Sequence, residues 1–166
     1  MTENKPPLHT ISVLVANKPG VLVRLALVFA KRGYNINSLV VSPTVNPKFS
    51  RMTITAKGDL ETLEQIIKNV SKLIDVIHCG EHPAHAVEKE LALFKAKSSP
   101  AMKAFVTKNA RKFHVRIDDS AQGYCIIEQT GTTAQLDEFE ALIKKYGVLE
   151  MVRTGKVLMA RGKETT

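Results

Sequence analysis

The sequence predicts an α+β protein built from two tandem ferredoxin-like domains, each with the element order βαββαβ. Two observations support this. Short apolar runs alternate with longer stretches of helical periodicity, and the same order of elements recurs in the second half of the chain. The predicted boundaries are residues 8–80 for the first domain, 81–85 for the linker and 86–166 for the second domain.

The first domain begins with a strand over His9–Ala16, which stops at the turn Asn17-Lys18-Pro19-Gly20. A helix follows over Gly20–Arg32, and Gly33 closes it. Its predicted buried face consists of Leu22, Leu25, Ala26 and Phe29, at i, i+3, i+4 and i+7. The strand therefore leads through a tight turn directly into a helix N-terminus.

Two strands, a helix and a final strand complete the first domain. The strands cover Asn35–Ser42 and Ser50–Lys57, and the prolines between them end the ladder. The helix begins after Asp59, a suitable N-cap, and the last strand covers Leu73–Cys79. The predicted apolar face of this helix consists of Leu60, Leu63, Ile66, Ile67 and Val70.

The second domain repeats this order. Its helices are predicted after Ser98-Ser99-Pro100 and over Thr133–Tyr146. Their apolar faces carry Met102, Phe105, Val106 and Asn109 in the first, and Leu136, Phe139, Leu142 and Ile143 in the second. The predicted strands are Ala86–Ala96, Phe113–Ile117, Tyr124–Gln129, Val148–Val152 and Val157–Ala160, with a turn over residues 118–123.

The turn before the first helix has the character of a binding site without catalytic groups. Free N–H groups and the helix dipole at a helix N-terminus favour a carboxylate or phosphate. No acid, base or nucleophile lies in Asn17–Gly20. This corner is predicted to hold a small anionic ligand without transforming it.

Composition restricts the function classes. The net charge of +8 invites a nucleic-acid interpretation, but the basic residues are scattered and no nucleic-acid-binding motif occurs, so a basic surface facing an acidic partner subunit is preferred. The sequence contains no apolar run of about eighteen residues, so no membrane-spanning helix is predicted. The first residues lack a signal-peptide pattern, and the two cysteines, Cys79 and Cys125, favour reduced thiols; a cytoplasmic protein is expected.

Catalysis and metal binding are alternative functions for this chain. Asp118 and Asp119 lie in a predicted turn, and no nucleophile–base or cofactor fingerprint occurs. The short spacing of His78, Cys79, His82 and His85 would suit Zn²⁺, but an interdomain linker is the preferred interpretation, with no metal site. A stand-alone sensor that regulates transcription or another enzyme is a further alternative, although no DNA-binding module occurs.

A sheet covered by helices on one face leaves an edge strand open, and pairing two copies side by side would close it. Such a homodimer would bring two copies of the Asn17–Gly20 turn toward a shared interface.

Several motifs resemble the regulatory, or small, subunit of acetolactate synthase (acetohydroxyacid synthase). The N-terminal ones are NKPGVLVR from Asn17, RGYNINSL from Arg32 and SRMTI from Ser50. Further along the chain are HAVEKELAL from His85, TGT from Thr130, LDEF from Leu136 and RTG from Arg153. Together they span nearly the whole chain in the order typical of that family.

The resemblance implies an N-terminal ACT domain that binds a branched-chain amino acid, usually valine, at the interface of an ACT dimer. It also implies a large catalytic subunit as partner, carrying thiamine diphosphate, Mg²⁺ and FAD. This chain would hold none of these cofactors and do no chemistry. It would activate the catalytic subunit and confer feedback inhibition.

The resemblance transfers an effector site to six residues, Asn17, Gly20, Val21, Leu22, Asn35 and Ile36. The last two would come from the facing strand across the dimer. Backbone N–H groups at residues 20–22 suit a carboxylate, Asn17 or Asn35 could accept from an ammonium, and Val21, Leu22 and Ile36 suit an isopropyl group.

Each of these residues also has a simpler structural role. Gly20 could be only a turn glycine, the two asparagines could cap a turn and a strand, and the three apolar residues could be core. Ala16 and Lys18 occupy positions where some family members carry acidic residues, so valine, leucine and isoleucine all remain open as effectors.

Overall fold

The computed structural model describes residues 7–81 and 86–166. The contacts between Cα atoms divide the chain into two compact units. The first unit runs to Val87 and also includes Lys156–Thr166, whereas the second covers Glu88–Gly155. The C-terminal eleven residues are grouped with the first unit by these contacts, and the domain boundaries expected from the sequence stay a prediction. Of the predicted linker, residues 82–85 lie outside the described residues.

Both units have the predicted element order βαββαβ. The first contains β1 (Leu8–Ala16), α1 (Val21–Lys31), β2 (Ile36–Pro43), β3 (Phe49–Lys57), α2 (Leu60–Val70) and β4 (Val76–Glu81). The second contains β5 (Val87–Lys97), α3 (Pro100–Phe113), β6 (Val115–Ala121), β7 (Tyr124–Gly131), α4 (Thr133–Ile143), a short 3-10 helix (Lys144–Tyr146) and β8 (Val148–Arg153). A last short strand, β9, covers Val157–Met159.

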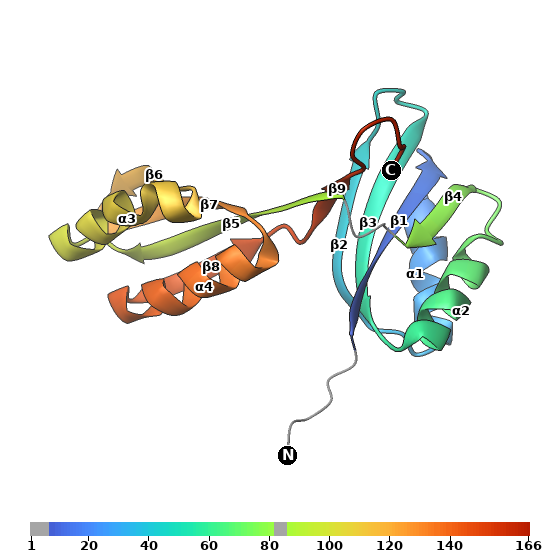
Figure 1. The fold of residues 1–166 in the computed structure, drawn as a ribbon, viewed down its shortest axis with the longest axis horizontal. Coiled ribbons are helices and arrows are strands. Elements are labelled where there is room, and N and C mark those ends of the chain that lie inside the picture. The colour runs from blue at the N-terminus through green and yellow to red at the C-terminus, as the bar shows by residue number, and fades with distance from the viewer. Residues whose placement is uncertain (1–6, 82–85) are drawn as a thin grey trace, which may run out of the picture. The chain divides into compact units, whose positions relative to one another are not determined.

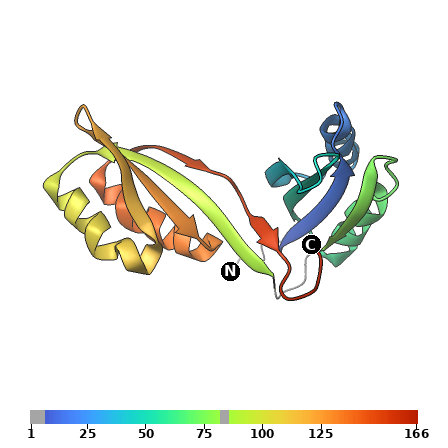
Figure 2. The same ribbon diagram turned by 90° about the horizontal axis from the view of Figure 1, so that it is seen from above.

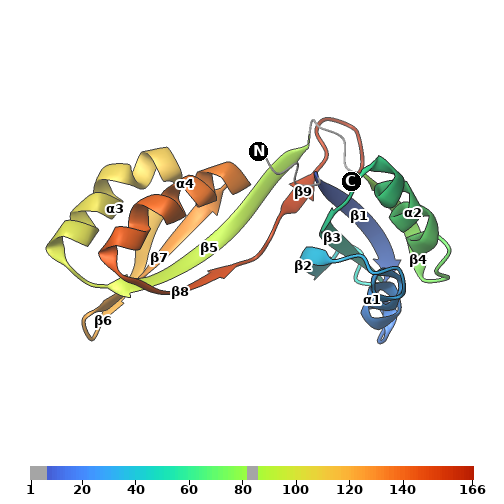
Figure 3. The same cartoon turned by 90° about the horizontal axis from the view of Figure 1, so that it is seen from below.

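The two sheets share one topology. Their antiparallel strand orders are β2-β3-β1-β4 and β6-β7-β5-β8. In the first unit α1 and α2 cover one face of the sheet (Figure 1), and in the second α3 and α4 do the same (Figure 2). Figure 3 shows β8 alongside β5 at the edge of the second sheet. The α+β class and the two ferredoxin-like units are therefore confirmed.

The core of each unit lies between its sheet and its helices. In the first unit, alternate residues of β1 and β3 point to the helices and are buried, among them Ile11, Val13, Met52 and Ile54. In the second, Phe139 of α4 contacts Phe94, Phe105 and Phe113, with ring centroids 5.5–6.0 Å apart. Full burial of a side chain of this size contributes about 1.5–3 kcal/mol, so these layers fix the helices on the sheets.

Several expected boundaries are wrong by a few residues. The last strand of the first unit begins at Val76, not Leu73, because residues 70–76 form two tight turns. Phe113 belongs to α3, and His114 ends that helix in the left-handed conformation. The predicted turn over residues 118–123 is mostly strand, because β6 and β7 meet in a hairpin at Gln122-Gly123, both with positive φ. The helix predicted to Tyr146 ends at Ile143, and Leu142 is exposed.

The apolar face of α1 also differs from the expected one. The buried residues are Val21, Leu25 and Phe29, whereas Leu22 is exposed. Likewise, Leu60 of α2 is exposed, although it was placed on the buried face. Residues 21–23 and 27–29 are all apolar, so periodicity alone left the rotation of α1 undetermined.

Candidate functional site

The turn between β1 and α1 is held in place from two sides. The backbone N–H of Ala16 donates to the carbonyl of Asp75, and that of Asn17 donates to the carbonyl of Lys48, both at 2.8 Å. The Asn17 side chain adds a third bond, in which Nδ2 donates to the Pro47 carbonyl at 2.9 Å. Asn17 therefore ties this turn to the β2–β3 hairpin while remaining exposed itself.

Gly20 ends the turn in a conformation that suits glycine. Its φ of 81° lies in the left-handed region, and a Cβ built on it would lie 3.2 Å from Nη1 of Arg24. It is the N-cap of α1, and no side chain caps this helix. In α2, α3 and α4, by contrast, Asp59, Ser99 and Thr132 each accept a backbone N–H. The N-terminus of α1 is therefore open to an external acceptor.

The charges around this corner do not oppose an anion. The first turn of α1 contains no acidic residue. The nearby carboxylate of Asp75 is paired with Arg24 at 2.5 Å. These two residues are 51 positions apart, and no pattern in the sequence predicts their pairing. Only the sheet topology brings them together, so no short-range pattern could have revealed this pair.

Val21 and Leu22 offer different groups to the corner. Val21 is only 3% exposed and packs in the core, so its side chain cannot contact a ligand at the surface. Its backbone N–H makes a long bond of 3.4 Å to the carbonyl of Lys18. Leu22 is 41% exposed, and its side chain is left uncovered beside the turn.

Asn35 and Ile36 lie at the opposite end of the sheet from Gly20 within one chain. Ile36 pairs with Ala56 on β3, whereas Ala16 pairs with Phe49 at the other end of the same strand. Seven residues of strand separate the two pairs, which is roughly 23 Å. Asn35 is exposed and Ile36 half-buried, and both lie where β2, an edge strand, begins. One chain therefore brings together Asn17, Gly20, Val21 and Leu22, but not Asn35 and Ile36.

The described residues contain no cluster of metal ligands. In residues 7–81 and 86–166 no group of three or more His, Cys, Asp or Glu side chains could hold a metal ion. His78 and Cys79 are neighbours on β4 and point to opposite faces of the sheet. Burial raises the pKa of the Cys79 thiol to about 11, which disfavours the thiolate that a metal needs. His82 and His85 lie outside the described residues.

Two family models match the chain, one per unit. Residues 11–78 match the AHAS small subunit-like ACT domain, and residues 89–162 match the small subunit of acetolactate synthase. The chain belongs to the acetolactate synthase small-subunit family.

Individual relatives agree with this assignment. A protein of Archaeoglobus fulgidus named as a probable acetolactate synthase small subunit is 44% identical over 154 residues, covering 93% of this chain and 97% of that one. The acetolactate synthase small subunit of Mycolicibacterium smegmatis is 38% identical over 160 residues, covering 96% of this chain and 94% of that one. The crystal structure of the small subunit from Thermotoga maritima superimposes with a TM-score of 0.84 at 37% identity, covering 95% of this chain and 99% of that chain.

The small-subunit motifs of the second unit meet in one ion-pair cluster. Arg153 donates to Glu90 at 2.8 Å and to Asp137 at 2.6 Å, and the Thr133 hydroxyl donates to Glu90. Glu90 is 6% exposed, so this is a buried carboxylate with two partners. Sequence reasoning used these segments only as family markers and did not foresee that they contact one another.

No helix in the described part of the chain is long and apolar enough to cross a bilayer.

Proposed function

We propose that this small subunit regulates acetolactate synthase by binding valine, or a related branched-chain amino acid, between two ACT domains. The observation that supports this most is the uncapped N-terminus of α1 behind Gly20. A left-handed glycine leaves no side chain over the first N–H groups of the helix, so a ligand carboxylate can approach them.

The groups around this corner match the other parts of an amino acid. Nδ2 of Asn17 donates to the Pro47 carbonyl, which fixes the amide group. Oδ1 is therefore the atom of this side chain that would accept from the ligand ammonium. The exposed side chain of Leu22 offers an apolar surface to the isopropyl group. Val21 contributes backbone only, in contrast to the expected role of its side chain.

A second copy of the chain would complete the site. Asn35 and Ile36 are too far from Gly20 within one protomer, and they lie at the open edge strand β2. Pairing two chains along this edge would satisfy the free strand and add a second set of contacts to the ligand. The homodimer is therefore part of the proposal.

The regulatory effect requires unequal affinity of the ligand for two arrangements of the assembly. A coupling of about 1–3 kcal/mol would suffice to inhibit the enzyme measurably. The large catalytic subunit would carry the thiamine diphosphate, Mg²⁺ and FAD, and the assembly would act in the cytoplasm. This chain would supply activation and feedback inhibition without a catalytic group.

Reconstitution with the catalytic subunit tests the proposal. The chain alone should convert no pyruvate, and its addition should raise the activity of the catalytic subunit and make it sensitive to valine. Gly20→Asp places a carboxylate where the ligand carboxylate would bind, so this variant should still activate but ignore valine. Gly123→Asp is the matched control, because Gly123 also has a positive φ and lies in the second unit.

If addition of this chain changes neither the activity of the catalytic subunit nor its inhibition by valine, the proposed regulatory function is wrong. Persistent valine inhibition of the Gly20→Asp assembly would overturn the site. Calorimetry of the isolated chain with valine, leucine and isoleucine in parallel would decide which effector is preferred.

A further inference from the structure

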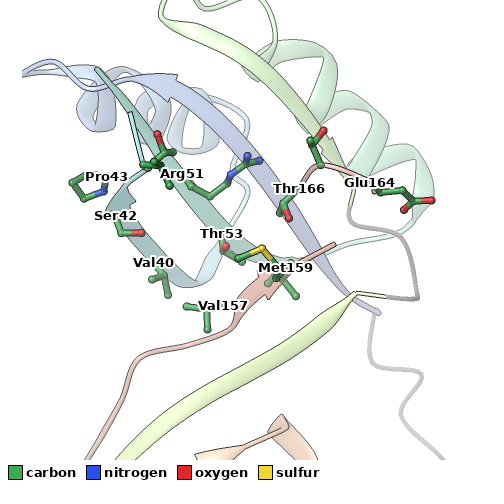
Figure 4. A pocket seen from close by; sticks show the side chains of 13 residues that line it. Val40, Ser42, Pro43, Arg51, Thr53, Val157, Met159, Glu164 and Thr166 are labelled. Atoms are coloured by element: carbon green, nitrogen blue, oxygen red, sulfur yellow. The ribbon is translucent and has the colours of Figure 1, made fainter. Parts of the chain in front are cut away.

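A pocket of about 550 Å³ lies on the sheet face of the first unit that is turned away from α1 and α2 (Figure 4). Alternate residues of β3 point to the helices, so Arg51 and Thr53 point to the other face, together with their partners Val40 and Ser42 on β2. Val157 and Met159 line the opposite side, and all residues that line the pocket belong to the first unit. Its volume is typical of small-molecule sites.

Arg51 gives this pocket a positive charge without a counter-ion. Its Nη1 donates to the Ser12 hydroxyl at 3.1 Å, and no carboxylate in the described part of the chain forms an ion pair with it. Burial lowers the pKa of the Arg51 guanidinium, since the charge is partly removed from water. Arg24, Arg116 and Arg153, by comparison, each have a carboxylate partner within 2.8 Å.

Among the other side chains that line the pocket, only Glu164 is charged. Figure 4 shows the carboxylate of Glu164 directed away from Arg51. The hydroxyls of Ser42 and Thr53 lie on the sheet wall beside Arg51, and Val40, Val157 and Met159 provide apolar surface. The interior thus offers the Arg51 guanidinium as a strong partner to an anion.

We propose that this pocket binds a small aliphatic carboxylate, whose head pairs with Arg51 and whose chain lies against Val40, Val157 and Met159. The site is separate from the proposed amino-acid site behind Gly20.

Calorimetry of the full chain with 3-methylbutanoate, which is valine without its ammonium group, tests this proposal. We expect one binding site per chain, and no binding of the neutral 3-methylbutanamide. Arg51→Gln should weaken binding at least about tenfold, because it removes a charge-assisted hydrogen bond. Met159→Glu should weaken it similarly by adding a carboxylate to the opposite wall.

Two controls separate this site from other effects. Arg111→Gln removes an equal charge from the exposed surface of α3, and Gly20→Asp alters the proposed valine site; both should bind 3-methylbutanoate normally. Valine binding should survive Arg51→Gln and fail in Gly20→Asp, so the two proposals can fail independently. Absence of 3-methylbutanoate binding, equal binding of the amide, or unchanged affinity in Arg51→Gln would each overturn this inference.

Discussion

The corner between β1 and α1 and the corner between β5 and α3 occupy the same place in two units of the same topology. In both, the residue that leaves the strand donates its N–H to the neighbouring hairpin, Asn17 to Lys48 and Ser98 to Gly123, each at 2.8 Å. They differ at the helix N-cap. Ser99 has an extended backbone and accepts the Met102 N–H at 3.1 Å, whereas Gly20 is left-handed and offers no acceptor.

This difference shows that the same topology can either satisfy its helix N-termini and buried charges with its own side chains or leave them available to a ligand. The second unit satisfies its helix N-termini with its own side chains and adds the capping box of Thr132 and Gln135. It also neutralises the buried Glu90 with Arg153. The first unit leaves both the α1 N-terminus and the Arg51 guanidinium without an acidic or capping side chain among the described residues. The topology is shared, so the capacity to bind a ligand depends on a few residues.

The largest effect on stability is expected from breaking the Arg153–Glu90 ion pair of the second unit. Arg153→Met leaves the carboxylate of Glu90 buried without its cation, which should lower the free energy of unfolding by about 3 kcal/mol. Urea denaturation measures this change. Arg116→Met, which breaks the exposed pair with Glu128, should lower the free energy of unfolding much less. An equal decrease in both variants would show that the buried Glu90 does not depend on Arg153 for its charge compensation.

The next largest effect is expected at the β1–α1 turn, where a substitution of Gly20 should change valine affinity much more than stability. Asn tolerates the left-handed region, so Gly20→Asn should change the free energy of unfolding by less than about 1 kcal/mol. Its side chain nevertheless covers the N–H groups of α1, and valine affinity should fall at least about tenfold, or 1.4 kcal/mol. Calorimetry and denaturation of one preparation compare the two quantities. Full valine affinity in this variant would rule out a ligand on these N–H groups.

A smaller effect is expected from removing the cap of the closed corner. Ser99→Ala takes the acceptor from the Met102 N–H and should cost about 1 kcal/mol of stability without changing valine affinity. Ser98→Ala is the control, since the hydrogen bond from Ser98 to the Gly123 carbonyl is made by its backbone N–H. A loss of valine binding in Ser99→Ala would show that the two corners are not independent.

The smallest effect concerns pH. Hydrogen bonding to Thr62 holds the pKa of the Asp59 carboxyl below its ordinary value. The folded-state pKa is depressed, so the stabilising contribution is present above the unfolded-state pKa and is lost as pH falls through the folded-state pKa. Asp59→Asn keeps a neutral cap, and its stability should approach that of the natural protein as the solution is acidified from pH 6 to pH 2. A constant difference over this range would exclude the carboxylate charge as the cause.

The sequence was sufficient to predict the element order and the Gly20 corner, because both follow from local patterns. Alternation of apolar and polar residues identifies β3, and Pro19-Gly20 indicates a turn that ends β1 before an apolar helix. It was not sufficient to predict that Leu22 is exposed and Val21 buried. Almost every residue from Val21 to Phe29 is apolar, so the buried side of α1 is decided by the sheet beneath it.

Long-range relations were also beyond reach. The separation of Asn35 from Gly20 requires the register of β3 against both neighbours, and the Arg24–Asp75 pair requires the β1–β4 pairing. The grouping of Lys156–Thr166 with the first unit follows from contacts that no linear pattern encodes. Arg51, inside the quoted motif SRMTI, carried no signal that distinguished it from an ordinary surface arginine.

The strand registers also bear on how the sheets resist aggregation. The central pairings β1–β3 and β5–β7 are regular, whereas β1–β4, β2–β3, β5–β8 and β6–β7, which join the edge strands, each contain a register shift. A bulged edge twists and presents an interrupted row of donors and acceptors, so it is a poor template for unlimited strand addition. The bulged edges therefore disfavour fibre growth by strand addition, while a short, closed pairing between two copies remains accessible.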